Sequence, residues 1–200
     1  MDQRLIIASN NKIKSEELIT FFKAFNIAAV WYRDLIEKVE FPVEGESSYY
    51  DNALIKAQFL QHKLPKEWIV ADDSGMELHA FPNKYGILTA RQLRQETNFD
   101  DDDVLNDYLV QITDKSGDRA ITMRTALVVL SPAGKVYISH GSFTGELVKY
   151  PSHHLNQGFD PLLFVPKLGK TFAELSVQES LKWQHRAIAV KQMADQLEEQ

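Results

Sequence analysis

The chain has 200 residues, a formal net charge of −6 and no cysteine. This length fits one large domain or two lobes that share a core. The negative charge argues against nucleic acid as a partner, and the lack of cysteine excludes disulfides and thiolate catalysis. The apolar run that follows Met1–Arg4 is too short for a signal sequence or a membrane span, so we expect a cytoplasmic protein with no membrane partner.

A strand-to-helix turn opens the chain. Leu5–Ala8 is an apolar run that predicts a buried strand, and Ser9–Asn11 is a cluster of turn and N-cap residues. The helix predicted next has apolar residues at helical spacing, namely Leu18, Ile19, Phe22 and Phe25. Backbone N–H groups and the helix dipole at such a turn favour an anion, and Lys12 and Lys14 lie close by. The same pattern also fits an ordinary turn with solvated lysines.

An acidic loop and a second helix come after a predicted strand at Ile27–Tyr32. The loop is Phe41–Glu46, and the helix is expected from about Ser47 to Lys63. Its buried stripe is predicted to be Ala53, Ala57 and Leu60. Asn52 and Lys56 lie one turn apart beside that stripe. Such a lysine can extend its ammonium to solvent or project it into an acidic or phosphate-filled cleft.

Two adjacent acids stand where a third strand is predicted to end. The apolar run Trp68–Ala71 is followed by Asp72–Gly75, and a second short run, Met76–Leu78, leads away. Neighbouring side chains of a strand point to opposite faces. Asp72 and Asp73 should therefore do different jobs, one facing a cleft and a metal and the other bracing the backbone or a neighbouring element. Asp-Ser-Gly is also good turn chemistry, so a capped turn is the competing interpretation.

Acids, strands and histidines follow in the second half of the chain. Four acids at Asp100–Asp103 precede a predicted helix and fit an N-cap that complements the helix dipole, with a metal site as the alternative. Ala120–Leu130 and Val136–Phe143 predict a β hairpin. His153 and His154 have no obvious third metal ligand nearby, so we interpret them as exposed loop residues.

The last part of the chain predicts a tight turn at Gly158–Pro161, a short strand and a terminal helix from Gln178 to about Leu197. His185 and Arg186 lie near the start of that helix, either on the surface or projecting into a site. Strands and helices alternate early and a hairpin comes late. This order predicts an α/β fold with a mixed twisted sheet flanked by helices. We expect two lobes with no separable linker, so that residues 1–200 form one domain.

Six stretches, in order, resemble the motifs of the inosine triphosphate pyrophosphatase family. They are Ala8–Lys14; Glu44 with Tyr50–Ala57; Ala71–Met76; Thr89–Arg91; Gly158–Pro166; and Phe172–Leu175 with His185 and Arg186. Each motif alone is weak, but six in order across nearly the whole chain are specific. The resemblance implies a central nucleotide cleft between the lobes. It also implies hydrolysis of non-standard purine triphosphates (ITP, dITP and XTP) to a monophosphate and pyrophosphate, which cleanses the nucleotide pool.

The resemblance also implies roles for individual residues. Asp73 would be the general base for the attacking water, or its close organiser, and Lys56 a second catalytic residue, while Asp72 would be structural. The cofactor would be Mg²⁺, held by Glu44 and Asp73. The phosphates would lie on Ser9, Asn11, Lys14, Lys56 and Ser74. The base would be bound by Phe159, Asp160, His185 and Arg186. The family is often dimeric, so a homodimer is implied.

Four positions depart from the family pattern, one of them Tyr85, which stands where a proline usually precedes the glycine before the Thr89–Arg91 segment. Gln157 stands where an aromatic residue stacks on the base, Ser180 where a lysine stands, and Gln184 where a serine stands. The hydrolytic end matches the family while the base-reading end is altered, so we expect a weaker or different base preference. One alternative is therefore a pyrophosphohydrolase for a modified pyrimidine or a standard triphosphate. The other is a nucleotide-binding sensor that has lost turnover, which the retained Glu44 and Asp73 argue against.

Overall fold

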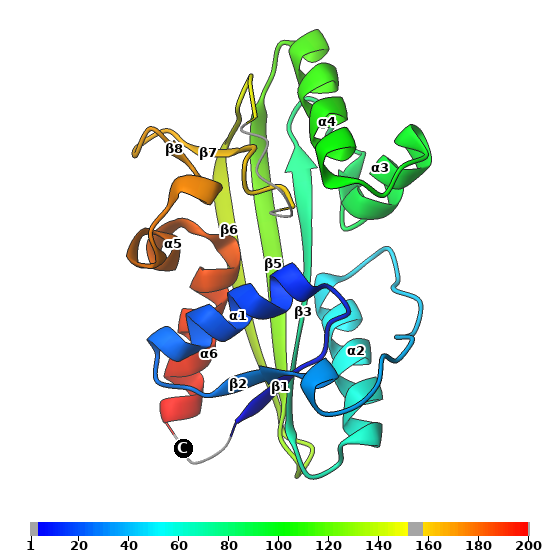
Figure 1. Ribbon diagram of the computed structural model, residues 1–200, viewed down its shortest axis with the longest axis vertical. Helices are drawn as coiled ribbons and strands as arrows, with labels where there is room; N and C mark the ends of the chain where they lie inside the picture. Colours follow the sequence, from blue (N-terminus) through cyan, green and yellow to red (C-terminus); the bar gives the residue numbers. More distant parts are fainter. Residues whose placement is uncertain (1–3, 152–157, 200) are drawn as a thin grey trace. The chain divides into compact units, whose positions relative to one another are not determined.

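The computed structural model describes residues 4–151 and 158–199, which divide into two compact units (Figure 1). Unit 1 comprises Met1–Ser74, Thr125–Gly141 and His185–Gln200. Unit 2 comprises Gly75–Arg124 and Ser142–Gln184. Three long strands contribute residues to both units: β3 (Trp68–Leu78), β5 (Ala120–Leu130) and β6 (Val136–Leu147).

Unit 1 is a sheet in the order β2-β1-β3-β5-β6 with helices packed against it. The short strand β1 (Leu5–Ile7) pairs in parallel with β2 (Ala29–Trp31) on one side and with β3 on the other. The other elements of this unit are α1 (Lys12–Ala24), the 3-10 helix η1 (Tyr32–Asp34), α2 (Tyr49–Lys63) and α6 (His185–Glu198).

The alternation of side chains along β3 sorts the two faces of the sheet in unit 1. Ile69 and Ala71 lie in one core cluster with α2. The residues that α2 adds to this cluster are the predicted stripe, Ala53, Ala57 and Leu60. Because successive side chains alternate, Val70 and Asp72 point to the opposite face. The helices α1 and α6 lie side by side on that face (Figure 1).

Unit 2 adds strands and helices to the remaining parts of β3, β5 and β6. The strand β4 (Tyr85–Gly86) pairs antiparallel with β3, β7 (Leu163–Val165) with β6, and β8 (Lys170–Thr171) with β7. The helices of unit 2 are α3 (Thr89–Thr97), α4 (Asp102–Ser116), η2 (Phe172–Glu174) and α5 (Val177–Trp183). Residues of β4, β7, α3, α4 and η2 share one core cluster with the unit 2 parts of β3, β5 and β6, and Trp183 of α5 packs against it. Parallel and antiparallel pairs in a helix-flanked sheet confirm the predicted fold class.

Two element predictions are wrong. The strand β3 does not end at Ala71 but runs through Asp72–Gly75 to Leu78, so the stretch forms neither a strand end nor a capped turn. The polar side chains of this stretch have buried partners, so no turn is needed to expose them. The single terminal helix is two helices, α5 and α6, because Gln184 between them is extended, with φ −75° and ψ 132°.

The acids before α4 act as the predicted cap. The carboxylate of Asp101 accepts hydrogen bonds from the backbone N–H groups of Asp103 and Val104, at 3.1 and 3.2 Å. Within residues 4–151 and 158–199, no group of three or more acidic or histidine side chains is placed to hold a metal ion. The interpretations of His153, His154 and Gln157 fall outside the residues that the structure describes.

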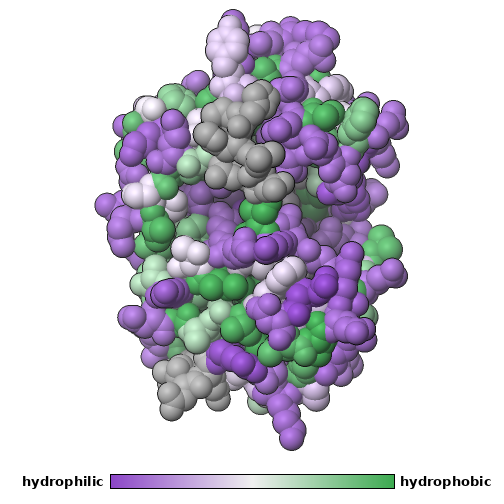
Figure 2. Space-filling view, viewed as in Figure 1, coloured by the Kyte–Doolittle hydropathy of each residue, from purple (hydrophilic) through white to green (hydrophobic). Residues whose placement is uncertain are grey.

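The visible surface is mostly hydrophilic. Figure 2 shows hydrophobic residues as scattered patches among hydrophilic ones. Val43 and Tyr150 are the most exposed of the large apolar side chains that the structure describes, at 92% and 80%. In the described part of the chain, no helix has both the length and the apolar character needed to cross a membrane.

Candidate active site

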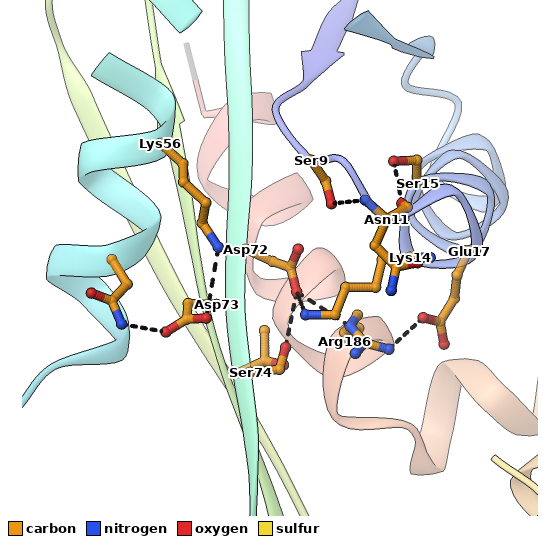
Figure 3. Close-up of polar contacts among 12 residues, drawn as sticks. Ser9, Asn11, Lys14, Ser15, Glu17, Lys56, Asp72, Asp73, Ser74 and Arg186 are labelled. Atoms are coloured by element: carbon orange, nitrogen blue, oxygen red, sulfur yellow. Dashed lines mark hydrogen bonds and ion pairs between the residues drawn. The ribbon is translucent and has the colours of Figure 1, made fainter. Parts of the chain in front are cut away.

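Asp73 lies on the α2 face of β3 and is 5% exposed. The side-chain amide of Asn52 donates to its Oδ2 atom at 2.8 Å, and the Nζ atom of Lys56 lies 3.6 Å from its Oδ1 atom. Lys56 also donates to Oε1 of Glu44 at 2.8 Å. Figure 3 shows Lys56 and Asp73 together on one side of the strand. One ammonium therefore lies between two carboxylates, one from the acidic loop and one from β3.

Asn52 fixes the acidic loop next to Asp73. Its Oδ1 atom accepts a hydrogen bond from the Gly45 backbone N–H at 2.7 Å, and its Nδ2 atom also donates to the Gly45 carbonyl at 3.2 Å. A single buried amide thus holds both the carboxylate and the loop that carries Glu44. Sequence reasoning gave Asn52 no role in the site. Its place one turn before Lys56 on the same stripe was the available signal.

The charges in this group shift each other's pKa. Burial raises the pKa of Asp73, Lys56 and Asn52 oppose this, Glu44 adds to it, and the net pKa is raised. Burial lowers the pKa of Lys56, but the nearby carboxylates Asp72, Asp73 and Glu44 outweigh it, so that pKa is raised. The site therefore holds a protonated lysine beside a carboxylate with more proton affinity than an ordinary aspartate, as a general base needs.

Asp72 lies on the opposite face and gathers three donors on its Oδ2 atom. They are Ser74 Oγ at 2.9 Å, Arg186 Nε at 3.3 Å and Lys14 Nζ at 3.4 Å (Figure 3). Burial would raise the pKa of Asp72, but the charges of Lys14, Arg186 and Lys56 outweigh burial and hold it well below its usual range. Asp72 is therefore a permanent anion that holds two cations together.

Glu17 extends this network on α1. Its Oε2 atom lies 2.5 Å from Nη1 of Arg186, so the guanidinium bridges Glu17 and Asp72 (Figure 3). The neighbouring His185 is 1% exposed, and burial, together with the charges of Arg186 and Lys14, lowers its pKa well below the usual value. The imidazole is therefore neutral at pH 7. Sequence reasoning missed Glu17, although it follows Lys14 by one helical turn.

The predicted phosphate turn forms at the N-terminus of α1. Asn11 is the N-cap, with Oδ1 accepting from the Lys14 backbone N–H at 3.0 Å, and Ser9 Oγ accepts from the Asn11 N–H at 3.1 Å. Burial lowers the pKa of Lys14, and Asp72 offsets this only in part. Ser74, also predicted for phosphate, lies on β3, where its hydroxyl is 2.7 Å from that of Thr125.

The four residues predicted to bind a base fall in different units. Phe159 and Asp160 belong to unit 2, where Phe159 packs against the core cluster and Gln184 Nε2 donates to Asp160 Oδ2 at 3.4 Å. His185 and Arg186 belong to unit 1, in the network around Asp72. Gln184, which departs from the family pattern, is therefore a direct neighbour of a predicted base-binding residue.

A sequence model of the Ham1 family matches residues 5–196. The chain belongs to the Ham1 family. It is 36% identical over 199 residues to a protein of Limosilactobacillus reuteri named dihydroneopterin triphosphate diphosphatase, with 100% of both chains covered. It is 28% identical over 196 residues to the dITP/XTP pyrophosphatase of Leuconostoc mesenteroides subsp. mesenteroides, covering 97% and 96% of the two chains.

A solved Ham1 structure has the same fold. The Staphylococcus aureus Ham1 protein superposes with a TM-score of 0.76 at 26% identity, with 98% of each chain covered. The resemblance of the six ordered motifs to the inosine triphosphate pyrophosphatase family is thereby confirmed.

Proposed function

We propose that this Ham1-family chain is a hydrolase that cleaves a triphosphate to a monophosphate and pyrophosphate, in the manner of a nucleotide-pool enzyme. The observation that carries the proposal is the pairing of Glu44 and Asp73 on the ammonium of Lys56. The phosphate turn at the start of α1 belongs to the same unit. The names of the relatives, pyrophosphatase and diphosphatase, support the same reaction.

Mg²⁺ is the proposed cofactor, and the donor set fits it. Glu44 and Asp73 offer hard carboxylate oxygens, and Mg²⁺ commonly takes one or two protein carboxylates together with waters and phosphate oxygens. The contacts of Lys56 with both side chains show that the two carboxylates already share one cation. When bound, the metal would neutralise triphosphate charge and make a water molecule more acidic.

The protein groups supply the remaining chemistry. Asp73 accepts the proton of the attacking water, for which its raised pKa suits it. Lys56 orients Asp73 and adds positive charge beside the phosphates. The water oxygen bonds to the α-phosphorus as the bond to the bridging oxygen breaks, and pyrophosphate leaves with that electron pair. The proposed phosphate ligands are Ser9, Asn11, Lys14, Lys56 and Ser74.

The ring of the substrate has two candidates. One is a non-standard purine, which the name of the Leuconostoc relative supports. The other is a reduced pterin, which the 36% identity to the dihydroneopterin triphosphate diphosphatase supports. We propose that His185 and Arg186 of unit 1 contact the ring, and Phe159 and Asp160 of unit 2 are separate candidates for the same role. The pterin is tested first because the identity to the relative named for it, 36%, exceeds the 28% identity to the Leuconostoc relative.

A substrate panel tests the reaction and the ring together. ITP, dITP, XTP, dUTP, ATP, GTP and dihydroneopterin triphosphate are incubated with purified protein and Mg²⁺, and pyrophosphate and orthophosphate are measured separately. We expect pyrophosphate with at least one of the first three or with the pterin. EDTA should abolish the activity and added Mg²⁺ restore it. Release of orthophosphate alone would show that the proposed reaction is wrong.

We also propose a homodimer that acts in the cytoplasm, on the family resemblance and on the charge and cysteine content of the chain. Light scattering after size-exclusion chromatography measures the mass in solution, and a monomer mass would contradict the dimer.

A further inference from the structure

Three groups in unit 1 close a ring of hydrogen bonds. The hydroxyl of Tyr32 donates to Oδ1 of Asn10. The Nδ2 atom of Asn10 donates to the Val39 carbonyl at 2.9 Å, and the Val39 backbone N–H donates back to the Tyr32 hydroxyl at 3.2 Å. Each of the three residues therefore both donates and accepts. Tyr32 is fully buried in the α2 core cluster, so its hydroxyl needs these partners.

The ring joins two segments that matter for the proposed site. Asn10 lies in the turn that precedes α1, between the proposed phosphate ligands Ser9 and Asn11. Val39 lies in the irregular segment between η1 and α2 that leads to Glu44. The Tyr32 hydroxyl is the group that both segments share.

Aromatic side chains pack around Tyr32 in the core. The rings of Tyr32 and Phe41 meet edge-to-face at 5.7 Å, and Phe41 packs on Phe59 of α2 at 5.6 Å. Trp31 donates its indole N–H to the Ser9 carbonyl at 2.7 Å. These contacts place the Tyr32 hydroxyl within a packed frame, so the hydroxyl can fix the positions of Asn10 and Val39.

The acidic loop thus has one anchor on each side of its exposed part. The Val39 peptide is held by Tyr32 and Asn10, and Gly45 is held by Asn52. Between the anchors, Val43 is 92% exposed and contributes little packing. The position of Glu44 therefore depends on the anchors more than on burial.

We propose that Tyr32 is a positioning residue whose hydroxyl sets the phosphate turn and the Glu44 loop in one arrangement before substrate binds. The inference rests on the proposed function. Without the hydroxyl, the turn and the loop sample other arrangements. The apparent affinity for metal and triphosphate then falls with the fraction of molecules that are competent. Saturating substrate draws the segments back into place, so turnover at saturation is retained.

Tyr32→Phe tests this because it keeps the ring packing and removes only the hydroxyl. We expect KM for the triphosphate and the apparent Mg²⁺ constant to rise by about tenfold, since the variant loses two hydrogen bonds. We expect kcat to stay within about twofold. A purely structural defect would instead lower the amount of active enzyme, so kcat would fall and KM would not change.

Tyr137→Phe is the matched control. Tyr137 is a buried tyrosine of the same unit, 6% exposed, and within the described residues its hydroxyl has no hydrogen-bond partner. This variant should match the wild type in KM. Asn10→Ala should mimic Tyr32→Phe, and combining the two should add little, because both open the same ring. Asn10→Ala and Tyr137→Phe should instead be additive.

Direct binding separates this inference from the proposed reaction. The probe is an ITP analogue with a methylene bridge between its α and β phosphorus atoms. It is titrated into the protein in the presence of Mg²⁺, and binding is measured by calorimetry. Weaker binding to Tyr32→Phe but not to Tyr137→Phe supports the positioning role, even if the wild type releases no pyrophosphate and the proposed reaction fails. Unchanged binding and KM in Tyr32→Phe would overturn the inference. A wild type that neither binds nor hydrolyses would overturn both.

Discussion

Asp72 and Asp73 point to opposite faces of β3. The same substitution, aspartate to asparagine, should therefore affect stability at one position and activity at the other. Asp72→Asn should destabilise the fold. Asp73→Asn should lower pyrophosphate release by about 10²–10⁴-fold and leave stability nearly unchanged. Both side chains are buried, at 1% and 5% exposure, so burial alone does not predict different effects. The difference comes from the groups that each carboxylate contacts.

The magnitude for Asp72 comes from its donors. Its Oδ2 atom lies within 3.4 Å of Lys14, Arg186 and Ser74, and its lowered pKa means that the fold favours the charged form. Removing that charge leaves two cations facing each other in a buried place. Breaking a buried ion pair in this way costs about 3–5 kcal/mol. For a chain of this length, Tm should fall by roughly 6–20 °C.

For Asp73, burial outweighs the nearby positive charge in setting the pKa. Burial raises its pKa, so the fold does not favour its charged form and a neutral amide costs little. The introduced amide keeps one oxygen that can accept from Asn52 or Lys56, and Lys56 keeps its hydrogen bond to Glu44. We expect the stability to change by about 1 kcal/mol or less. Losing the proposed general base should lower turnover by about 10²–10⁴-fold.

Urea unfolding measures the stability of each variant, and a pyrophosphate-release assay on the same preparations measures its turnover. Two results would refute the reasoning. An Asp72→Asn protein as stable as the wild type would show that the three donors do not depend on its charge. An Asp73→Asn protein with wild-type turnover would remove Asp73 as the base.

Four further substitutions test other contacts. Gly141→Ala should cost about 4 kcal/mol or more, because a Cβ there would lie 1.8 Å from the His185 carbonyl oxygen. Gly134→Ala, where φ is +80° and no atom is near, should cost only about 1–2 kcal/mol in urea unfolding. Below about pH 6.5 the unfolded chain protonates His185 while the buried imidazole stays neutral, so stability should fall as pH drops, by at most about 1.4 kcal/mol per pH unit. In His185→Gln, the free energy of unfolding should therefore depend less on pH between pH 7.5 and 5. Gln184→Ser should lower the ratio of kcat/KM for dihydroneopterin triphosphate over dITP by about tenfold, and an unchanged ratio would show that Gln184 does not face the ring.

Local periodicity predicted the elements whose signals are local. The run Ala120–Leu130 was predicted as a strand with the bounds that β5 has, and the stripe of α2 was predicted residue by residue. The continuation of β3 through Asp72 could not be predicted in this way. Its donors Lys14 and Arg186 lie 58 and 114 residues away in sequence, and without them two acids in a buried strand are too costly.

The sequence carries no local signal for the break between α5 and α6. Trp183 and Ala187 keep helical spacing across the break, and neither proline nor glycine stands there. The start of α5 does have a recognisable capping box, since Ser176 and Glu179 bond reciprocally to each other's backbone N–H groups. The end at Gln184 follows from tertiary packing, which the sequence pattern does not contain.

The motifs identified the charged groups of the site but not the residues that hold them. Glu44, Lys56 and Asp73 were predicted and lie together. Asn52 and Glu17 each complete a contact with a residue on another element, which sequence spacing cannot supply.

The charges of unit 1 explain why the proposed function needs a divalent cation for binding as well as for turnover. Three cations, Lys14, Lys56 and Arg186, are paired with four carboxylates, Glu17, Glu44, Asp72 and Asp73. The group is therefore anionic before a triphosphate arrives, and its lysines are already engaged by acids. A further polyanion placed beside Glu44 and Asp73 would be repelled at short range, where screening is weak. A divalent ion held by Glu44 and Asp73 would offset this negative charge. It would also free the ammonium of Lys56 from Glu44 and let it turn toward the substrate.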